Sequence, residues 1–119
     1  MGNKTLSRKL TNIKDNNMTK YNGWTNYETW NFKLWADNDE PTYKKVQKLI
    51  EDVKNNPLDE GKDVQNLGSE LRRLSNENAP ELETSFYSDI MMSGMCEVNY
   101  LEIAERLLED YELDQKAKF

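Results

Sequence analysis

The sequence predicts a mostly α-helical protein, a compact bundle of about five helices preceded by a mobile basic arm. Three observations carry this prediction. Apolar residues recur at spacings of three and four along most of the chain, proline or asparagine interrupts these runs, and no segment alternates convincingly between apolar and polar residues. A small two- or three-stranded β element near the tryptophans is the main alternative within this class.

Charge divides the chain into two parts. Residues 1–20 carry five cations against one carboxylate, a net charge of +4, and since the total is −6 the remaining residues carry −10. The arm has too few apolar groups to offset the entropy cost of ordering it, so we expect residues 1–20 to be mobile. Residues 21–119 are predicted to form one acidic helical domain, because a chain of this length has room for little else.

The first helix is predicted over residues 26–37. Asn22-Gly23 indicates a turn, and the following Thr25 with Glu28 resembles a capping box in which Thr25 is the N-cap. Aromatic residues occupy so much of the circumference that this helix is expected at the centre of the core. The core residues predicted for this part of the chain are Trp24, Tyr27, Trp30, Leu34 and Trp35, with Phe32 pointing elsewhere.

Three further helices are predicted in the middle of the chain. Pro41 marks the start of one that continues to residue 53, and a second covers residues 64–74, where Gly68 would let another helix approach closely. Residues 81–95 are broadly helical, and Cys96 after them is expected to be a small buried residue.

The last helix has the clearest pattern. Asn99 is its predicted N-cap, with Glu102 at the third position. An apolar stripe from Tyr100 to Tyr111 follows, and its predicted core residues include Tyr100, Ile103 and Leu107. The outer face carries Glu102, Glu105, Glu109 and Glu112.

Composition argues against an enzyme, a metal site and a bound cofactor. The chain has no histidine and one cysteine, which removes the commonest general base and the ordinary zinc ligands, and its glycines form no phosphate-binding loop. Asp37-Asn38-Asp39-Glu40 resembles the opening of a calcium loop, but Thr42 stands where such a loop needs glycine. These residues are better interpreted as the end of one helix and the start of the next.

The expected location is the cytoplasm. A single cysteine forms no internal disulfide, no apolar run approaches the ~20 residues of a membrane span, and the N-terminus lacks the apolar core of a signal peptide. Neither a membrane nor a compartment outside the cell is therefore implied.

Acidic residues concentrate toward the C-terminus. Residues 77–119 hold eleven carboxylates against three cations. Such a run is most often only a solvated helix face, but this density also suits recognition of a basic surface on another protein. The aromatic cluster near residues 24–35 is interpreted as core packing rather than as a nucleic-acid stacking platform, because carboxylates surround it and one lysine, Lys33, lies within it.

Two segments carry a family resemblance. The run Gly23-Trp24-Thr25-Asn26-Tyr27-Glu28-Thr29-Trp30, with Leu34-Trp35 and Asn38-Asp39, resembles the signature of a family of small proteins of bacteriophages, plasmids and other mobile elements. Glu97-Val98-Asn99-Tyr100, Glu102-Ile103-Ala104-Glu105 and Leu107-Leu108-Glu109-Asp110 are similar to its C-terminal block. The family has no assigned function, so the resemblance implies a habitat and no catalytic residues.

The leading hypothesis is an inhibitor of a host nucleic-acid-handling defence protein, such as a CRISPR effector or a restriction enzyme. Such targets have basic channels, which an acidic face made of Glu102, Glu105, Glu109 and Glu112 could occupy. The first alternative is a nucleic-acid-binding accessory or regulatory protein, whose phosphate contacts would be Lys4, Arg8, Lys9 and Lys14. The second alternative is a structural or assembly protein.

Overall fold

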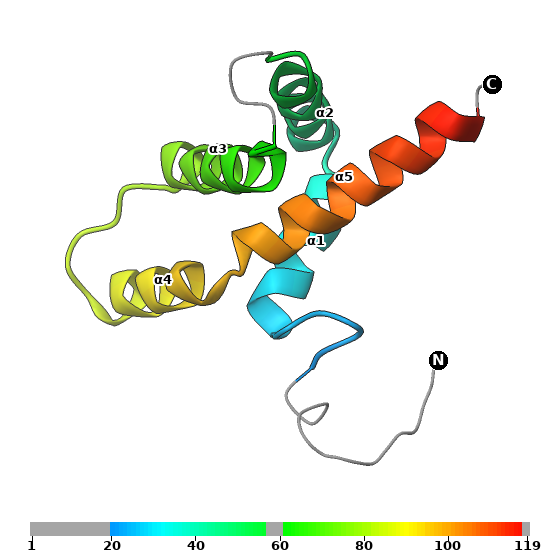
Figure 1. Cartoon of the computed structure of the whole chain (residues 1–119). Helices are drawn as coiled ribbons and strands as arrows, with labels where there is room; N and C mark the ends of the chain where they lie inside the picture. Colours follow the sequence, from blue (N-terminus) through cyan, green and yellow to red (C-terminus); the bar gives the residue numbers. More distant parts are fainter. Residues whose placement is uncertain (1–19, 57–60, 118–119) are drawn as a thin grey trace.

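The computed structural model describes residues 20–56 and 61–117, and five helices account for most of them. The helices are α1 (Tyr27–Asn38), α2 (Glu40–Lys54), α3 (Asp63–Asn78), α4 (Phe86–Glu97) and α5 (Tyr100–Ala117) (Figure 1). The predicted helical bundle is confirmed. The basic arm, apart from Lys20, lies outside the described residues.

A tight turn precedes α1. Tyr21 and Trp24 form an antiparallel bridge with reciprocal backbone hydrogen bonds, from Tyr21 N to Trp24 O (2.6 Å) and from Trp24 N to Tyr21 O (2.8 Å). Asn22 and Gly23 both have positive φ, 50° and 87°, which is the geometry of a type I′ turn and explains the Asn-Gly pair. In the described part of the chain, the predicted β alternative is thus reduced to this one bridge.

The N-terminus of α1 differs from the prediction by one residue. Asn26, not Thr25, is the N-cap, and its side chain accepts a hydrogen bond from Thr29 N (2.9 Å). The backbone N–H of Thr25 instead donates to Glu102 Oε1 (3.0 Å) on α5. The sequence around Thr25 also fits a capping box locally, but a contact 77 residues away decides which residue caps the helix.

The buried face of α1 also differs from the prediction. Trp35, Tyr27 and Leu34 are 61%, 49% and 40% exposed, whereas α1 buries Thr29 and Ala36. Phe32, predicted to point elsewhere, packs against the core, and its ring meets that of Tyr100 edge to face at 5.4 Å. A helix that is aromatic on several sides has no unique apolar stripe. The spacing of its apolar residues therefore could not show that the face with the small residues Thr29 and Ala36 packs against the core.

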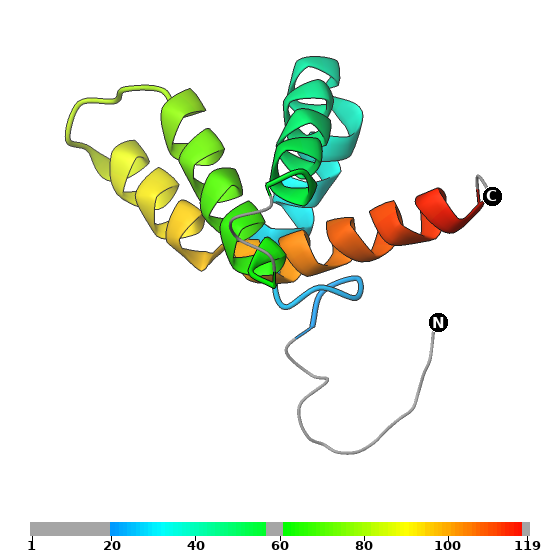
Figure 2. The same cartoon turned by 45° about the horizontal axis from the view of Figure 1, so that its top comes forward.

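Helices α2, α3 and α5 form the centre of the core, and here the predicted stripes are confirmed. Val46, Ile50 and Val53 of α2 are buried against Leu67, Leu71 and Leu74 of α3 and Tyr100, Ile103, Leu107 and Leu108 of α5. In Figure 2, α5 runs across one end of the pair formed by α2 and α3. The most extensive contact is between α3 and α5, and it passes through buried Gly68, as predicted.

Helix α4 begins five residues later than predicted. Ser85 caps it through a reciprocal pair of hydrogen bonds with Ser88, so residues 81–84 lie ahead of the helix. None of its residues is buried, and Ile90 is 57% exposed. Cys96, predicted to be buried, is exposed as well. No helix in the described part of the chain is both long and apolar enough to cross a membrane.

Thr29 joins α1 to the start of α5, and replacing it by valine is expected to destabilise the fold. Its fully buried hydroxyl donates to Asn26 Oδ1 (2.6 Å) and accepts from Asn99 N (2.8 Å). Thr29→Val keeps the shape but leaves the Asn99 N–H without its acceptor, which should lower the free energy of unfolding by about 1–3 kcal/mol. Urea denaturation measures this. Thr84→Val, at an exposed position, is the control and should change stability by less than ~0.5 kcal/mol.

Candidate functional site

All four acidic residues predicted to bind a partner lie on the outer face of α5. This helix has six carboxylates against Arg106 and Lys116, and its opposite face is buried in the core. Glu105 and Glu109, one turn apart, are both exposed. Neither carboxylate makes an ion pair or a hydrogen bond with another residue in the described ranges 20–56 and 61–117.

Glu102 has a structural contact that the sequence did not indicate. Its backbone N–H donates to Asn99 Oδ1 (3.0 Å), which confirms the predicted cap of α5. Its carboxylate accepts the hydrogen bond from Thr25 N, and its side chain is only partly exposed. Glu102 therefore fastens the turn before α1 to α5, and it is less accessible to a partner than Glu105 or Glu109.

Arg106 lies on the same side of α5 as Glu102 and also contacts this turn. Its guanidinium stacks over the ring of Trp24 at 4.2 Å from the centroid and donates from Nη2 to Gly23 O (2.7 Å). Trp24 is buried, as predicted. The one arginine of α5 is thus directed toward the turn, and it forms no ion pair with Glu105 or Glu109.

Glu112 is also engaged within the molecule. Lys54, at the end of α2, forms ion pairs with Glu112 of α5 and with Asp63 at the start of α3 (3.3 Å to Oδ2). The hydrogen bond to Glu112 is the main cause that raises the pKa of Lys54 above its usual value of 10.5. This lysine connects three helices where the chain passes from α2 to α3, a role that local sequence patterns do not reveal.

Removing this cation is expected to have a small, pH-dependent effect. Because the folded-state pKa of Lys54 is raised, its stabilisation is fully present below about pH 10 and is lost as pH rises through the folded-state value. Lys54→Met should therefore lower stability by about 0–1 kcal/mol at pH 7, and the difference from the wild type should begin to shrink as pH rises above 10.5. Urea denaturation of both proteins between pH 7 and 11 tests this. A difference that grows with pH would contradict it.

The remaining carboxylates of α5 do not serve the stability of the helix. Glu105 and Glu109 are like charges at i and i+4, a spacing that destabilises a helix by a few tenths of a kcal/mol. Asp114 lies in its last turn, where the helix dipole disfavours negative charge. Helix energetics therefore give no reason for this accumulation of exposed carboxylates.

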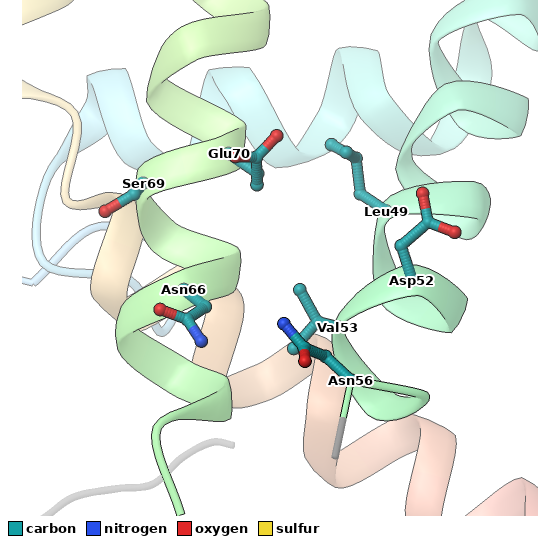
Figure 3. A pocket seen from close by; sticks show the side chains of 7 residues that line it. All are labelled: Leu49, Asp52, Val53, Asn56, Asn66, Ser69 and Glu70. Atoms are coloured by element: carbon teal, nitrogen blue, oxygen red, sulfur yellow. The ribbon is translucent and has the colours of Figure 1, made fainter. Parts of the chain in front are cut away.

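A cleft between α2 and α3 also contains carboxylates. It has a volume of about 300 Å³, and both Asp52 and Glu70 line it (Figure 3). Each of the two has a cation on its own helix: Lys48 lies 3.5 Å from Asp52, and Arg73 Nε donates to Glu70 (3.1 Å). This arrangement is that of paired surface charges.

The residues that resemble a calcium loop, 37–40, form the end of α1 and the start of α2, as interpreted from the sequence. Asp39 ends α1 and caps α2, and its Oδ2 accepts a hydrogen bond from Thr42 Oγ1 (2.6 Å). Among residues 20–56 and 61–117, no three Asp, Glu, Cys or His side chains come together in a way that could hold a metal ion.

The structure describes the predicted acidic contact residues but not the predicted basic ones. Of the acidic set, the structure places Glu105 and Glu109 in solvent and gives Glu102 and Glu112 internal partners, while Asp110 and Asp114 are exposed on other sides of α5. The basic set, Lys4, Arg8, Lys9 and Lys14, lies outside the described residues.

Comparison with known proteins gives a family and no activity. A family of unknown function, DUF7249, matches residues 17–113, so the chain belongs to it. No curated protein and no solved structure matches the chain.

Proposed function

We propose that this member of a family of unknown function is a binding protein without catalytic activity that inhibits a host protein by covering a basic surface. The observation that carries the proposal is the outer face of α5, where Glu105 and Glu109 are exposed without a counter-ion in the described part of the chain. The resemblance to proteins of phages and mobile elements supplies the context, and a nucleic-acid-handling defence protein such as a CRISPR effector or restriction enzyme is the class of target.

Rigidity supports this role. Ile103, Leu107 and Leu108 anchor α5 in the core, so the backbone that carries its outer carboxylates is already ordered and adds no further backbone entropy cost on binding. A preorganised negative face also accelerates encounter with a positively charged partner. Nucleic-acid channels present such a surface, because they bind phosphates with lysine and arginine.

The internal partners of Glu102 and Glu112 narrow the proposed contact. Glu102 holds the turn at Thr25, and Glu112 is partly neutralised by Lys54. The proposed centre of the contact is therefore Glu105 and Glu109.

Affinity capture from a bacterial lysate tests this proposal, with nuclease added to remove proteins bridged by nucleic acid. The tagged full chain is compared with the double variant Glu105→Gln, Glu109→Gln and with Glu51→Gln, Glu81→Gln. Both variants remove two exposed carboxylates, so they have the same net charge. We expect the specific partner to be recovered at least ~10-fold less with the α5 variant, the equivalent of about 1.4 kcal/mol, and unchanged with the control.

Equal recovery with both variants would contradict the role of the α5 face. Recovery that disappears when nuclease is added would instead favour nucleic-acid binding through the basic arm. Once a partner is identified, its enzymatic activity with and without the wild-type chain tests the inhibition itself.

A further inference from the structure

A second surface, formed by α1 and α4, is apolar and largely exposed. We define the α1–α4 surface as Tyr27 and Trp35 of α1 with Phe86, Tyr87 and Ile90 of α4. A cleft of about 480 Å³ runs between the two helices, with Tyr27 and Trp35 on one wall and Ile90 on the other. Phe86 and Tyr87, whose rings meet edge to face at 5.6 Å, continue the surface from Ile90 along α4.

The core does not explain the composition of α4. Six of its twelve residues are Phe, Tyr, Ile or Met, yet none of the twelve is buried. Phe86 and Tyr87 are 71% and 73% exposed. A helix that is apolar on several sides is normally covered by other parts of a protein, and a contiguous exposed apolar patch normally marks an interface.

Charge indicates which partner suits this surface. Among the residues that line the cleft, one is charged, Glu28, and α4 as a whole carries Asp89 and Glu97. By contrast α5 carries six carboxylates, and residues 21–119 have a net charge of −10. Two copies of this domain repel each other over an acidic face, but they can approach through the α1–α4 surface at little electrostatic cost. A basic partner would gain nothing from choosing this nearly uncharged region.

The available area is close to what a stable interface needs. An aromatic side chain buries ~150–250 Å², so the exposed parts of Trp35, Phe86 and Tyr87 amount to roughly 300–500 Å². Tyr27 and Ile90, each about half exposed, add to this. The total approaches the ~800 Å² that each partner contributes to a stable interface.

We propose that the protein forms a homodimer in which the α1–α4 surfaces of two copies pack against each other around a two-fold axis. The same patch on both copies is then self-complementary, and α4 of each copy covers the cleft of the other. The dimer follows from the apolar surface of α1 and α4, so it does not depend on the proposed function of α5.

Sedimentation equilibrium of the full chain between about 1 and 100 μM tests this proposal. We expect the mass of two chains for the wild type, and a dissociation constant at least 100-fold higher for Ile90→Glu. Trp35→Ser, on the opposite wall of the cleft, should weaken the dimer in the same direction. Leu113→Glu is the matched control: Leu113 is 63% exposed and lies on α5, so the same charge is introduced outside the surface and the dimer should persist.

Circular dichroism must show native helicity for each variant. We expect this, because all three substituted positions are exposed. A wild-type chain that is monomeric at 100 μM would overturn the proposal. So would a dimer that survives both Ile90→Glu and Trp35→Ser, or one that Leu113→Glu dissociates as strongly as Ile90→Glu does. Capture of a partner through α5 is a separate measurement, and its failure would leave these masses unchanged.

Discussion

Replacing Ile103 by alanine is expected to lower the free energy of unfolding by about 2–5 kcal/mol, because it removes three carbon atoms from the centre of the core. Ile103 is fully buried on α5, in the same cluster as Leu67 and Leu71 of α3. The contact between these helices is the most extensive in the molecule. A cavity at this position cannot be filled without moving one helix relative to the other.

Urea denaturation monitored by circular dichroism measures this loss. Leu113→Ala is the control, since Leu113 lies on the same helix and is 63% exposed. It should change stability by less than ~0.5 kcal/mol. A loss of under ~1 kcal/mol for Ile103→Ala would mean that α5 is not packed into the core as described.

Replacing Gly68 by leucine is expected to force α3 and α5 apart. A Cβ at position 68 would lie 3.0 Å from Leu101 Cδ2 and 3.6 Å from the Cα and N atoms of the same residue. The additional carbons of a leucine would crowd the backbone of α5 at Leu101, which already lies 3.6 Å from the Cβ position. We expect a loss of about 1–3 kcal/mol or more, as for other overpacked cores.

Gly68→Ala separates this steric effect from helix propensity. Its Cβ would contact the end of the Leu101 side chain, which is 54% exposed and free to move. Alanine also favours a helix over glycine by up to ~1 kcal/mol. The alanine variant should therefore be close to the wild type in urea denaturation. Equal stability of the leucine variant would contradict the close approach of α3 and α5.

The helices with one clear apolar stripe were predictable from the sequence. Their apolar residues follow the helical period and are buried: Val46, Ile50 and Val53 in α2, Leu67, Leu71 and Leu74 in α3, and Ile103 and Leu107 in α5. The cap of α5 was also predictable, because Asn99 makes its capping hydrogen bond with Glu102 three residues later.

The buried face of α1 was not predictable by the same reasoning. Its core contacts are made by Thr29, Ala36 and Phe32, together with Trp30, the one aromatic of α1 predicted in the core that packs against it, while Tyr27 and Trp35 remain exposed. Thr29 is acceptable in the core only because Asn26 and the backbone of Asn99 satisfy its hydroxyl. The partner at Asn99 is 70 residues away, so no local pattern could indicate it.

The candidate site shows the same division. The sequence identifies the outer face of α5, but it does not reveal that Glu102 binds the turn at Thr25 or that Lys54 pairs with Glu112. Both contacts join segments more than 50 residues apart. Cys96 was expected to be buried because free cysteines usually are, but it is exposed. Helix α4 starts late because Ser85 and Ser88 form its capping box.

If exposed carboxylates on α5 bind a basic protein surface, the binding of that partner must depend on salt. We would measure the dissociation constant of the captured partner for the wild-type chain and for Glu105→Gln, Glu109→Gln at about 50 and 300 mM salt. We expect wild-type affinity to fall at least ~10-fold over this range, because screening weakens exposed charge pairs. We expect the double variant to bind weakly and with little salt dependence. A wild-type affinity that is unchanged by salt, or equal to that of the variant, would contradict binding through these carboxylates.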